Sequence, residues 1–238
     1  MNARRNIYAV VPIKETGDAK QRLAQVLGTA RRQELALAMF EDVLATLARV
    51  RELAGIIVVT ADSAAGAIAS RYGARVSSDG AREGHTGAVA AAARQLAADD
   101  MLTVPGDIPL VQMDDIRRLL EAHGLATCRD ARAFVIVPAR DERGSNAIVC
   151  SPAGAVPLSF GADSFLPHLA AATRCGIEPT VLRLPRVALD IDTPDDLAVF
   201  LATPSHTRTR ALLEQVYPSS FRGAPTARSR NDGTRSGP

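Results

Sequence analysis

The stretch Ile7–Ile13, IYAVVPI, is a short run of apolar and β-branched residues, and the polar segment Lys14–Gln25 follows it directly. A run of this length and composition is typical of a strand buried on both faces, and the polar residues around Gly17 predict a loop after it. In open sheets of parallel strands, ligands bind at the carboxyl ends of the strands. We therefore expect the loop after this strand to border a binding site.

The same pattern recurs over the first 138 residues, where apolar runs alternate with amphipathic or Ala-rich segments. Strands are expected at 56–60, 74–77, 101–105 and 134–137, and helices at 31–50, 63–72, 87–98 and 113–123. Asp62 or Ser63 is a candidate N-cap, and Gly124 is expected to end the helix before it. The alternation predicts an α/β domain with a mostly parallel, twisted sheet and helices on both faces.

The rest of the chain is less regular. Strands are expected at 146–150 and 180–184, and helices at 163–175 and 194–202. We expect one domain over residues 1–203, a C-terminal helix within 204–217, and a disordered tail over 218–238, which is rich in Ser, Gly, Pro and Arg. The arginines of the tail could contact anionic partners, although a solvated tail is the simpler interpretation.

Composition and charge exclude several classes of protein. The chain has 238 residues, of which 47% are hydrophobic and 23% charged, and its net charge is only +2. This balance is typical of a globular domain and gives no reason to expect a nucleic acid or a membrane as partner. The apolar runs are too short to span a bilayer, and Ile7–Ile13 lacks a signal-peptide cleavage site, so we expect a cytoplasmic protein. The three cysteines, Cys128, Cys150 and Cys175, form no CxxC pair, which argues against zinc and disulfides.

Lys14 and Lys20 are the only lysines of the chain. The other 26 of its 28 lysines and arginines are arginines. Both lie with Arg22 in the loop after the first strand. A lysine carries a compact charge on a flexible stem, which suits neutralisation of a phosphate. We interpret the three residues as a polyphosphate-binding group, and a solvated charged loop is the alternative. Neither GxxxxGK[ST] nor GxGxxG is present, which argues against P-loop NTPases and dinucleotide-binding dehydrogenases.

Acidic residues stand at two further places. Asp107 lies in PGDIPL after the strand at 101–105, and Asp190 and Asp192 lie in LDIDTPDDL. In an extended segment Asp190 and Asp192 point to the same side, where they repel each other unless a cation joins them. Carboxylates together with phosphates describe a Mg²⁺ site. Alternatively, Asp107 only forms a turn and Asp190 is a solvated edge residue. Asp192 or Thr193 would then cap the next helix.

Three other loops could hold ligand groups. Glu83–Gly87 leads into an Ala-rich helix, Arg143–Asn146 precedes a strand, and Phe160–Ser164 precedes a helix that contains His168. Free N–H groups at the start of a helix favour anions. The alternative at each loop is an ordinary turn and N-cap. His85, taken alone, is more typical of a surface or packing residue than of a catalyst.

Together and in order, VPIK, AKQRL, PGDIPL, GSN, FGADSFLPH and LDIDTPDDL resemble the 2-phospho-L-lactate guanylyltransferase (CofC-like) family of GT-A-like nucleotidyltransferases. The resemblance runs from about residue 7 to residue 201. PGDIPL is shared by many nucleotidyltransferases, whereas FGxxSxxxH and DIDTPxDL are more specific. The resemblance implies a single GT-A-like (Rossmann-like) domain. It also implies an enzyme that transfers GMP from GTP to a small phosphorylated acid, releasing pyrophosphate, in coenzyme F420 biosynthesis.

The resemblance also implies roles for individual residues. The implied nucleotide ligands are Lys14, Lys20, Arg22, Gly84 and Thr86, the implied Mg²⁺ ligands are Asp107, Asp190 and Asp192, the implied acceptor ligands are Ser145, Gly161 and Ser164, and the implied catalytic residues are Lys14 and Asp107. Ser145 stands where the family usually has threonine, which keeps the hydroxyl. Gly84-His85-Thr86 stands where Gly-Leu-Asn is common, so the choice of base is less firmly implied.

Members of the family differ in their acceptor, which is 2-phospholactate, phosphoenolpyruvate or 3-phosphoglycerate. The Arg- and Ala-rich composition suggests a bacterial source and tilts the expectation away from 2-phospholactate. Two alternatives are a related transferase for a molybdopterin or a sugar phosphate, and a non-catalytic nucleotide-binding module. The loops at 144–146 and 161–164 argue against the first, and the paired acidic motifs argue against the second. The expected partners are GTP, the phosphorylated acid and the next enzyme of the F420 pathway.

Overall fold

The computed structural model describes residues 6–128 and 130–216, so the tail predicted at 218–238 lies outside the described residues. The strands are β1 (Ile7–Pro12), β2 (Gly55–Val59), β3 (Arg75–Ser77), β4 (Asp100–Thr103), β5 (Ala133–Pro138), β6 (Ser145–Ser151) and β7 (Pro179–Val181). The helices are α1 (Thr29–Leu47), α2 (Ser63–Arg71), α3 (Gly84–Leu96), α4 (Met113–Thr127), α5 (Phe165–Arg174), α6 (Pro185–Ala188), α7 (Pro194–Ala202) and α8 (Arg208–Val216), with the short 3-10 helices η1 (Thr16–Asp18) and η2 (Gln21–Leu23).

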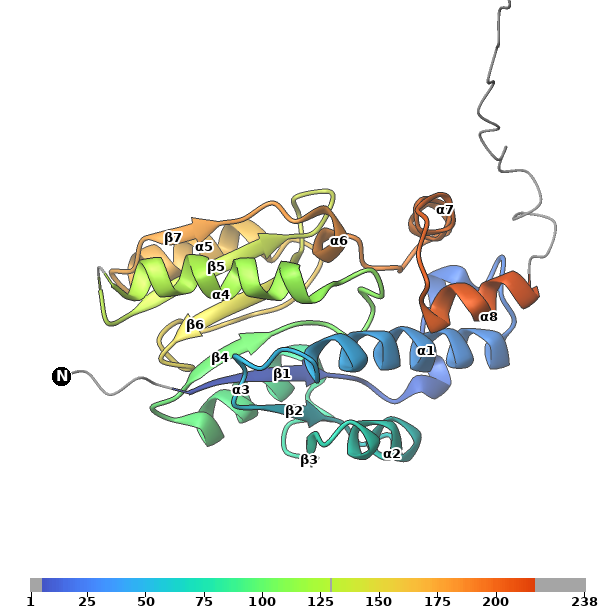
Figure 1. The fold of residues 1–238 in the computed structure, drawn as a ribbon, viewed down its shortest axis with the longest axis horizontal. Coiled ribbons are helices and arrows are strands. Elements are labelled where there is room, and N and C mark those ends of the chain that lie inside the picture. Colours follow the sequence, from blue (N-terminus) through green and yellow to red (C-terminus); the bar gives the residue numbers. More distant parts are fainter. Residues whose placement is uncertain (1–5, 129, 217–238) are drawn as a thin grey trace, which may run out of the picture.

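The strands form one mixed sheet in the order β3-β2-β1-β4-β6-β5-β7 (Figure 1). β1 pairs in parallel with β2 and β4, β2 with β3, and β5 with β7. β6 runs antiparallel to both of its neighbours. The prediction of a mostly parallel sheet is thus confirmed. Because β6 is reversed, its first residue, Ser145, lies at the sheet edge where β1, β4 and β5 end.

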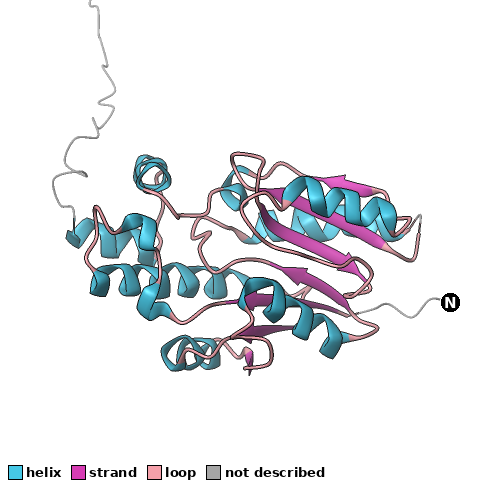
Figure 2. Cartoon of the chain, turned by 180° about the vertical axis from the view of Figure 1, so that it is seen from behind, coloured by secondary structure: helices cyan, strands magenta, loops and turns pink. Residues whose placement is uncertain are grey.

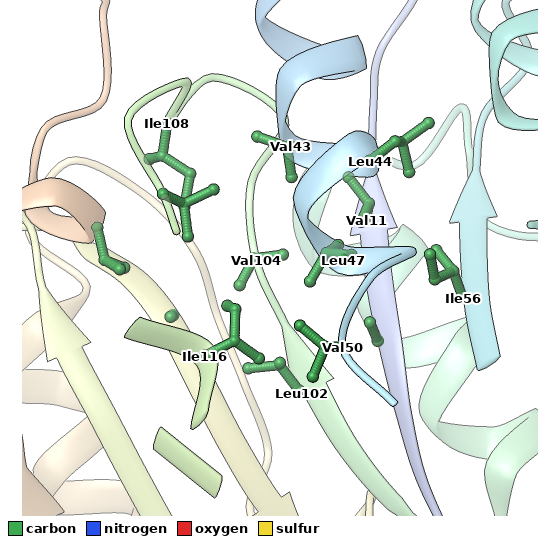
Figure 3. Close-up of a cluster of buried hydrophobic side chains, with 14 of the residues drawn as sticks. Val11, Val43, Leu44, Leu47, Val50, Ile56, Leu102, Val104, Ile108 and Ile116 are labelled. Atoms are coloured by element: carbon green, nitrogen blue, oxygen red, sulfur yellow. The ribbon is translucent and has the colours of Figure 1, made fainter. Parts of the chain in front are cut away.

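Helices cover both faces of the sheet, as the alternation of apolar segments predicts (Figure 2). Consecutive β1 residues serve opposite layers: Val11 packs with residues of α1, α2 and α4, whereas Val10 packs with residues of α3. Figure 3 shows the first layer, where Leu44 and Leu47 of α1 lie over the sheet. Burial of each such side chain stabilises the fold by about 1.5–3 kcal/mol. Two apolar layers therefore hold the strands that carry the site loops.

The C-terminal helices fasten the loop that follows β1. Leu23 of η2 is fully buried and belongs to the same apolar cluster as Phe200 of α7 and Leu213 of α8. At the start of α8, the Asp42 carboxylate on α1 accepts hydrogen bonds from the backbone N–H of Arg208 and Thr209, each at 2.9 Å. Figure 1 shows α8 alongside α1. Residues beyond 203 therefore contribute to the packing of the site loop.

Several details of local structure depart from the predictions. Gly124 does not end its helix, because α4 continues to Thr127, whose hydroxyl donates to the backbone oxygens of His123 and Gly124. The segment after β1 is not a plain loop, since it contains η1 and η2. Asp62 is confirmed as an N-cap, with its carboxylate accepting from two backbone N–H groups of α2. No helix in the described ranges is both long and apolar enough to cross a membrane.

Candidate active site

A cleft of about 1240 Å³ opens at the edge of the sheet where β1, β4 and β5 end and β6 begins. All residues predicted to bind nucleotide, acceptor or metal line it: Lys14, Lys20, Arg22, Gly84, Thr86, Asp107, Ser145, Gly161, Ser164, Asp190 and Asp192. These residues belong to segments that lie far apart in the sequence, from Lys14 to Asp192. The fold therefore brings the separate sequence motifs into one site.

Lys20 lies at the centre of the acidic part of the cleft. Its Nζ is 2.6 Å from Asp107 Oδ2 and 2.6 Å from Asp192 Oδ1. The Lys20 side chain is only 9% exposed, against 26% for Asp107 and 42% for Asp192. Burial by itself would lower the pKa of Lys20, but the attraction of the two carboxylates outweighs it and raises the pKa. Lys20 is therefore held as an ammonium ion that neutralises two acidic groups.

The backbone at Lys20 is unusual. Its φ of 54° and ψ of 45° place it in the left-handed region, which costs a residue with a Cβ about 1–2 kcal/mol. The flanking loop is held in place from outside: Asp62 Oδ2 accepts from the Thr16 N–H at 2.8 Å and from its hydroxyl at 2.6 Å. The buried Arg32 donates to the backbone oxygens of Ala19 and Leu27. These contacts and the two ion pairs offset the strain at Lys20.

Asp190 lies beside this group but has a different partner. Asn146, which is buried, donates through Nδ2 to Asp190 Oδ1 at 2.9 Å and to the Val187 oxygen at 3.0 Å. Burial, and next the negative charge of Asp107, raise the pKa of Asp190 to about 6. Asp190 is thus no solvated edge residue. It is a carboxylate whose charged form would be favoured by an added cation.

The carboxylates fit a divalent cation in chemistry, but they are not gathered around one point. No group of three or more His, Cys, Asp or Glu side chains within residues 6–128 and 130–216 is arranged to hold a metal ion. Asp107 Oδ1 is nevertheless buried and has no hydrogen-bond partner within the described part of the chain. A buried carboxylate oxygen of this kind needs a donor or a cation. Of the three predicted metal ligands, Asp107 and Asp192 share the Lys20 ammonium, whereas Asp190 is hydrogen bonded to Asn146.

The residues predicted to bind nucleotide lie on the β1 side of the cleft. Lys14 and Arg22 are exposed at its border. Gly84 has a φ of +74° and begins α3, so that Thr86 lies in the first turn of the helix. The centroid of the His85 ring lies 4.2 Å from that of the Phe160 ring, and burial lowers the pKa of His85 to about 4. His85 is therefore a packing residue and is neutral at pH 7.

The residues predicted to bind the acceptor face them from the loops at 144–146 and 160–164. Ser145 Oγ is 2.9 Å from His168 Nδ1 and 3.3 Å from Ser164 Oγ. Ser164 stands at the N-cap position of α5, yet its side chain makes no capping bond. Gly161 is exposed, and a Cβ there would meet open space. Thr193, in contrast, does cap α7, which leaves Asp192 free to pair with Lys20.

Sequence reasoning missed the residues that support the site. The sequence presents Asn146 only as part of GSN, and its bond to Asp190 follows from the reversed direction of β6. Phe160 joins the two sides, because its N–H donates to Thr86 Oγ1 at 2.9 Å and its ring lies 5.1 Å from that of His168. Asp62 was predicted only as a helix cap. A buried polar residue inside a motif is the signal that could have indicated Asn146.

The chain is similar in sequence to known guanylyltransferases. Residues 7–230 match the family model described as "Guanylyl transferase CofC like". The chain is 38% identical over 215 residues to a phosphoenolpyruvate guanylyltransferase of Roseiflexus castenholzii, which covers 88% of this chain and 95% of the relative. It is 36% identical over 191 residues to a 3-phospho-D-glycerate guanylyltransferase of Colwellia psychrerythraea, which covers 79% of this chain and 89% of that one.

Solved structures show the same fold at low sequence identity. A nucleotide-diphospho-sugar transferase from Desulfovibrio desulfuricans superposes with a TM-score of 0.68 at 21% identity, covering 92% of this chain and 98% of that one. A nucleotidyl transferase from Methanothermobacter gives a TM-score of 0.58 at 17% identity, covering 90% and 100%. The α/β, GT-A-like architecture is thereby confirmed.

Proposed function

Because the chain belongs to the family of CofC-like guanylyl transferases, we propose that it transfers GMP from GTP to phosphoenolpyruvate or 3-phosphoglycerate. In this reaction a phosphate oxygen of the acid forms a bond to the α-phosphorus of GTP. The bond between that phosphorus and the oxygen bridging to the β-phosphorus breaks, and pyrophosphate leaves with the electron pair. The product is a diphosphate-linked conjugate of guanosine and the acid.

One observation carries the proposal. A cationic and carboxylate group (Lys20, Asp107 and Asp192) and a pair of hydroxyls (Ser145 and Ser164) face the same cleft at the carboxyl edge of the sheet. The first suits a nucleotide polyphosphate with its cation, and the second suits the anionic groups of a small acid. A site that only binds nucleotide would not need the second pair.

The proposed reaction does not need a strong general base. An acceptor phosphate is already an anionic nucleophile at pH 7, so catalysis consists of alignment and stabilisation of charge. The two histidines that border the cleft loops, His85 and His168, both have pKa values lowered to about 4 by burial. They are neutral and weakly basic at pH 7. Lys14, exposed at the cleft border, can reach the phosphates without breaking an ion pair among the described residues.

Mg²⁺ is the proposed cofactor, held by Asp107, Asp190 and Asp192, and when bound it would neutralise the phosphates and orient them. A cation at these carboxylates would compete with the Lys20 ammonium, which bridges Asp107 and Asp192. An ammonium displaced from them would be available to a phosphate of the nucleotide. Asn146 would keep Asp190 in place, because it is hydrogen bonded on the side of the protein interior.

We further place the product in coenzyme F420 biosynthesis, as the family resemblance implies. The relatives are named for phosphoenolpyruvate and for 3-phosphoglycerate. Phosphoenolpyruvate is our first choice of acceptor, since several of the similar relatives carry that name. The nucleotide side keeps Thr86 as a hydrogen-bonding group where the family often has asparagine, and we expect guanine to be selected there.

The test is pyrophosphate release from the purified protein with Mg²⁺, each of four NTPs, and each of 2-phospholactate, phosphoenolpyruvate and 3-phosphoglycerate. Release with GTP and one acid only supports the proposal and identifies the acceptor. Release with another NTP keeps the reaction type and overturns the choice of guanine. Release only with a sugar phosphate or a molybdopterin, added as further wells, would overturn the acceptor class.

A further inference from the structure

His168 is a buried residue of α5 that the reaction scheme above does not use. It is 1% exposed, and both nitrogens of its ring have partners. Nε2 lies 3.0 Å from the backbone nitrogen of Ser159, and Nδ1 lies 2.9 Å from Ser145 Oγ. The ring therefore connects the backbone of one cleft loop with the hydroxyl of another.

The contact with Ser159 fixes the position of the ring proton. A backbone N–H can only donate, so Nε2 must accept and carries no proton. In a neutral imidazole the proton then lies on Nδ1, and Nδ1 donates to Ser145 Oγ. Burial keeps the ring neutral at pH 7. The local backbone thus selects one of the two neutral tautomers.

This choice also fixes the role of the Ser145 hydroxyl. Its oxygen accepts from His168 Nδ1–H at 2.9 Å and from the Ser164 hydroxyl at 3.3 Å. A hydroxyl oxygen has two acceptor sites and one hydrogen, so both acceptor sites are now occupied. The remaining hydrogen of Ser145 has to be donated elsewhere, and Ser145 lines the cleft.

We propose that His168 is a positioning residue that makes Ser145 a hydrogen-bond donor toward the cleft. The site then selects an acceptor substrate that has an anionic oxygen at this point. The ligand group is a carboxylate or phosphate oxygen, which can only accept. A hydroxyl or amide donor in the same place would find no acceptor on Ser145. The proposal rests on the proposed function for its substrate, but its hydrogen-bond pattern belongs to the protein alone.

The specificity argument follows from the cost of an unpaired polar group. A substrate analogue without a hydrogen-bond acceptor at this point leaves the Ser145 hydrogen without a partner. Sites of this kind reject such analogues strongly. His168 does not touch the substrate in this scheme. Its effect on acceptor binding therefore passes through Ser145, and removing both residues should cost no more than removing Ser145 alone.

The first test needs no activity. The chain has four histidines, and ¹⁵N-histidine labelling with ring-selective NMR reports which nitrogen of each carries a proton. The H168Q variant identifies the His168 signals by their loss. We expect a protonated Nδ1 and an unprotonated Nε2 at pH 7. A protonated Nε2 would overturn the proposal, whether or not the protein turns over any acid.

The second test uses steady-state kinetics with GTP and the preferred acid. H168Q removes the Nδ1 donor, and we expect KM for the acid to rise about tenfold, which is about 1.4 kcal/mol, with KM for GTP nearly unchanged. S145A should show a similar rise, and S145A/H168Q should equal S145A. H168N places an amide near the Nδ1 position and should recover part of the loss. H206Q, at an exposed histidine between α7 and α8, is the matched control.

The outcomes distinguish the positioning role of His168 from the proposed function of the protein. Equal effects of H168Q on KM for the acid and for GTP, or additive effects in the double variant, indicate a structural role and overturn the positioning role. A wild-type protein that uses none of the acids overturns the proposed function, while the ring tautomer still decides the state of Ser145. If H168Q does not fold, H168N and the wild-type NMR spectrum carry the decision.

Discussion

The two sides of the cleft are built in different ways. On one side, the charged half (Lys20, Asp107, Asp190 and Asp192), ion pairs of 2.6 Å join Lys20 to Asp107 and Asp192, and Asn146 holds Asp190. The other side, the neutral half (Ser145, Ser164 and His168), is held by hydrogen bonds between uncharged groups. Both halves are anchored by buried residues at the same edge of one sheet.

The difference separates two tasks. Ion pairs have little directionality, so the charged half can exchange Lys20 for another cation and adapt to a flexible polyphosphate. Hydrogen bonds between neutral groups are directional, so the neutral half can discriminate between acceptors and donors on a small ligand. The comparison predicts that variants of the charged half mainly reduce turnover, whereas variants of the neutral half mainly change KM for the acid.

The largest effect is expected at Asp107. D107N keeps the shape of the side chain but removes a charge that pairs with Lys20 and that would bind the cation. We expect kcat to fall about a thousandfold, with an unchanged circular dichroism spectrum. D114N, at an exposed residue in the first turn of α4, is the control and should keep normal turnover. Near-normal turnover of D107N would remove Asp107 from the proposed site.

Lys20 gives the next largest effect and tests whether it competes with the cation. K20M leaves Asp107 and Asp192 without their shared partner, and we expect kcat/KM to fall about a hundredfold. The same variant should bind Mn²⁺ more tightly, measured from the electron paramagnetic resonance signal of free Mn²⁺, because no ammonium has to be displaced.

The control for this variant is R31M, which removes an exposed ion pair of α1 outside the cleft and should leave Mn²⁺ binding unchanged. Weaker or equal Mn²⁺ binding by K20M would show that Lys20 and the cation do not compete. In that case a bound cation does not take the place between Asp107 and Asp192 that the Lys20 ammonium fills.

These two halves also differ in how far the sequence reveals them. The layers follow from apolar periodicity, because central strands such as β1 bury both faces and the helices bury one. The charged half could be predicted, since acidic residues after strands and two isolated lysines are visible as motifs. The pairing of Lys20 with two carboxylates could not, because it depends on the left-handed backbone at Lys20 and on the outside support from Asp62.

The neutral half is harder to predict. Ser145 and Ser164 are small residues in short polar motifs, for which an ordinary turn and N-cap is the alternative interpretation, yet the Ser164 side chain makes no capping bond. Their juxtaposition follows from the reversal of β6, which is a tertiary property. Gly124 shows the opposite error: a residue with a typical capping identity lies inside a continuing helix.

The pH dependence of stability provides a third way to test the comparison. The folded-state pKa of His168 is about 4, below its ordinary value of 6.5, because of burial. The unfolded chain takes up the proton first as pH falls, so the contribution is complete above about pH 6.5 and is lost toward pH 4. The loss is of the order of 3 kcal/mol.

The measurement is urea unfolding of the wild type and of H168Q at pH 7 and pH 4.5. Asp190 titrates in the same window with the opposite sign, because its folded-state pKa is raised to about 6, so only the difference between the two proteins isolates His168. We expect the wild type to lose more stability than H168Q. Equal losses would mean that His168 is not buried as a neutral ring.

The smallest effect is expected for S145T, and it distinguishes shape from hydrogen bonding in the neutral half. Threonine keeps the hydroxyl that accepts from His168 and Ser164 and adds one methyl group at the first residue of β6, where β-branched residues are favourable. We expect kcat/KM for the acid within about threefold of the wild type, since about 0.6 kcal/mol corresponds to that factor. S145A removes the donor and should raise KM for the acid, so equal behaviour of the two variants would show that the site selects its acceptor by shape and not through the hydroxyl of Ser145.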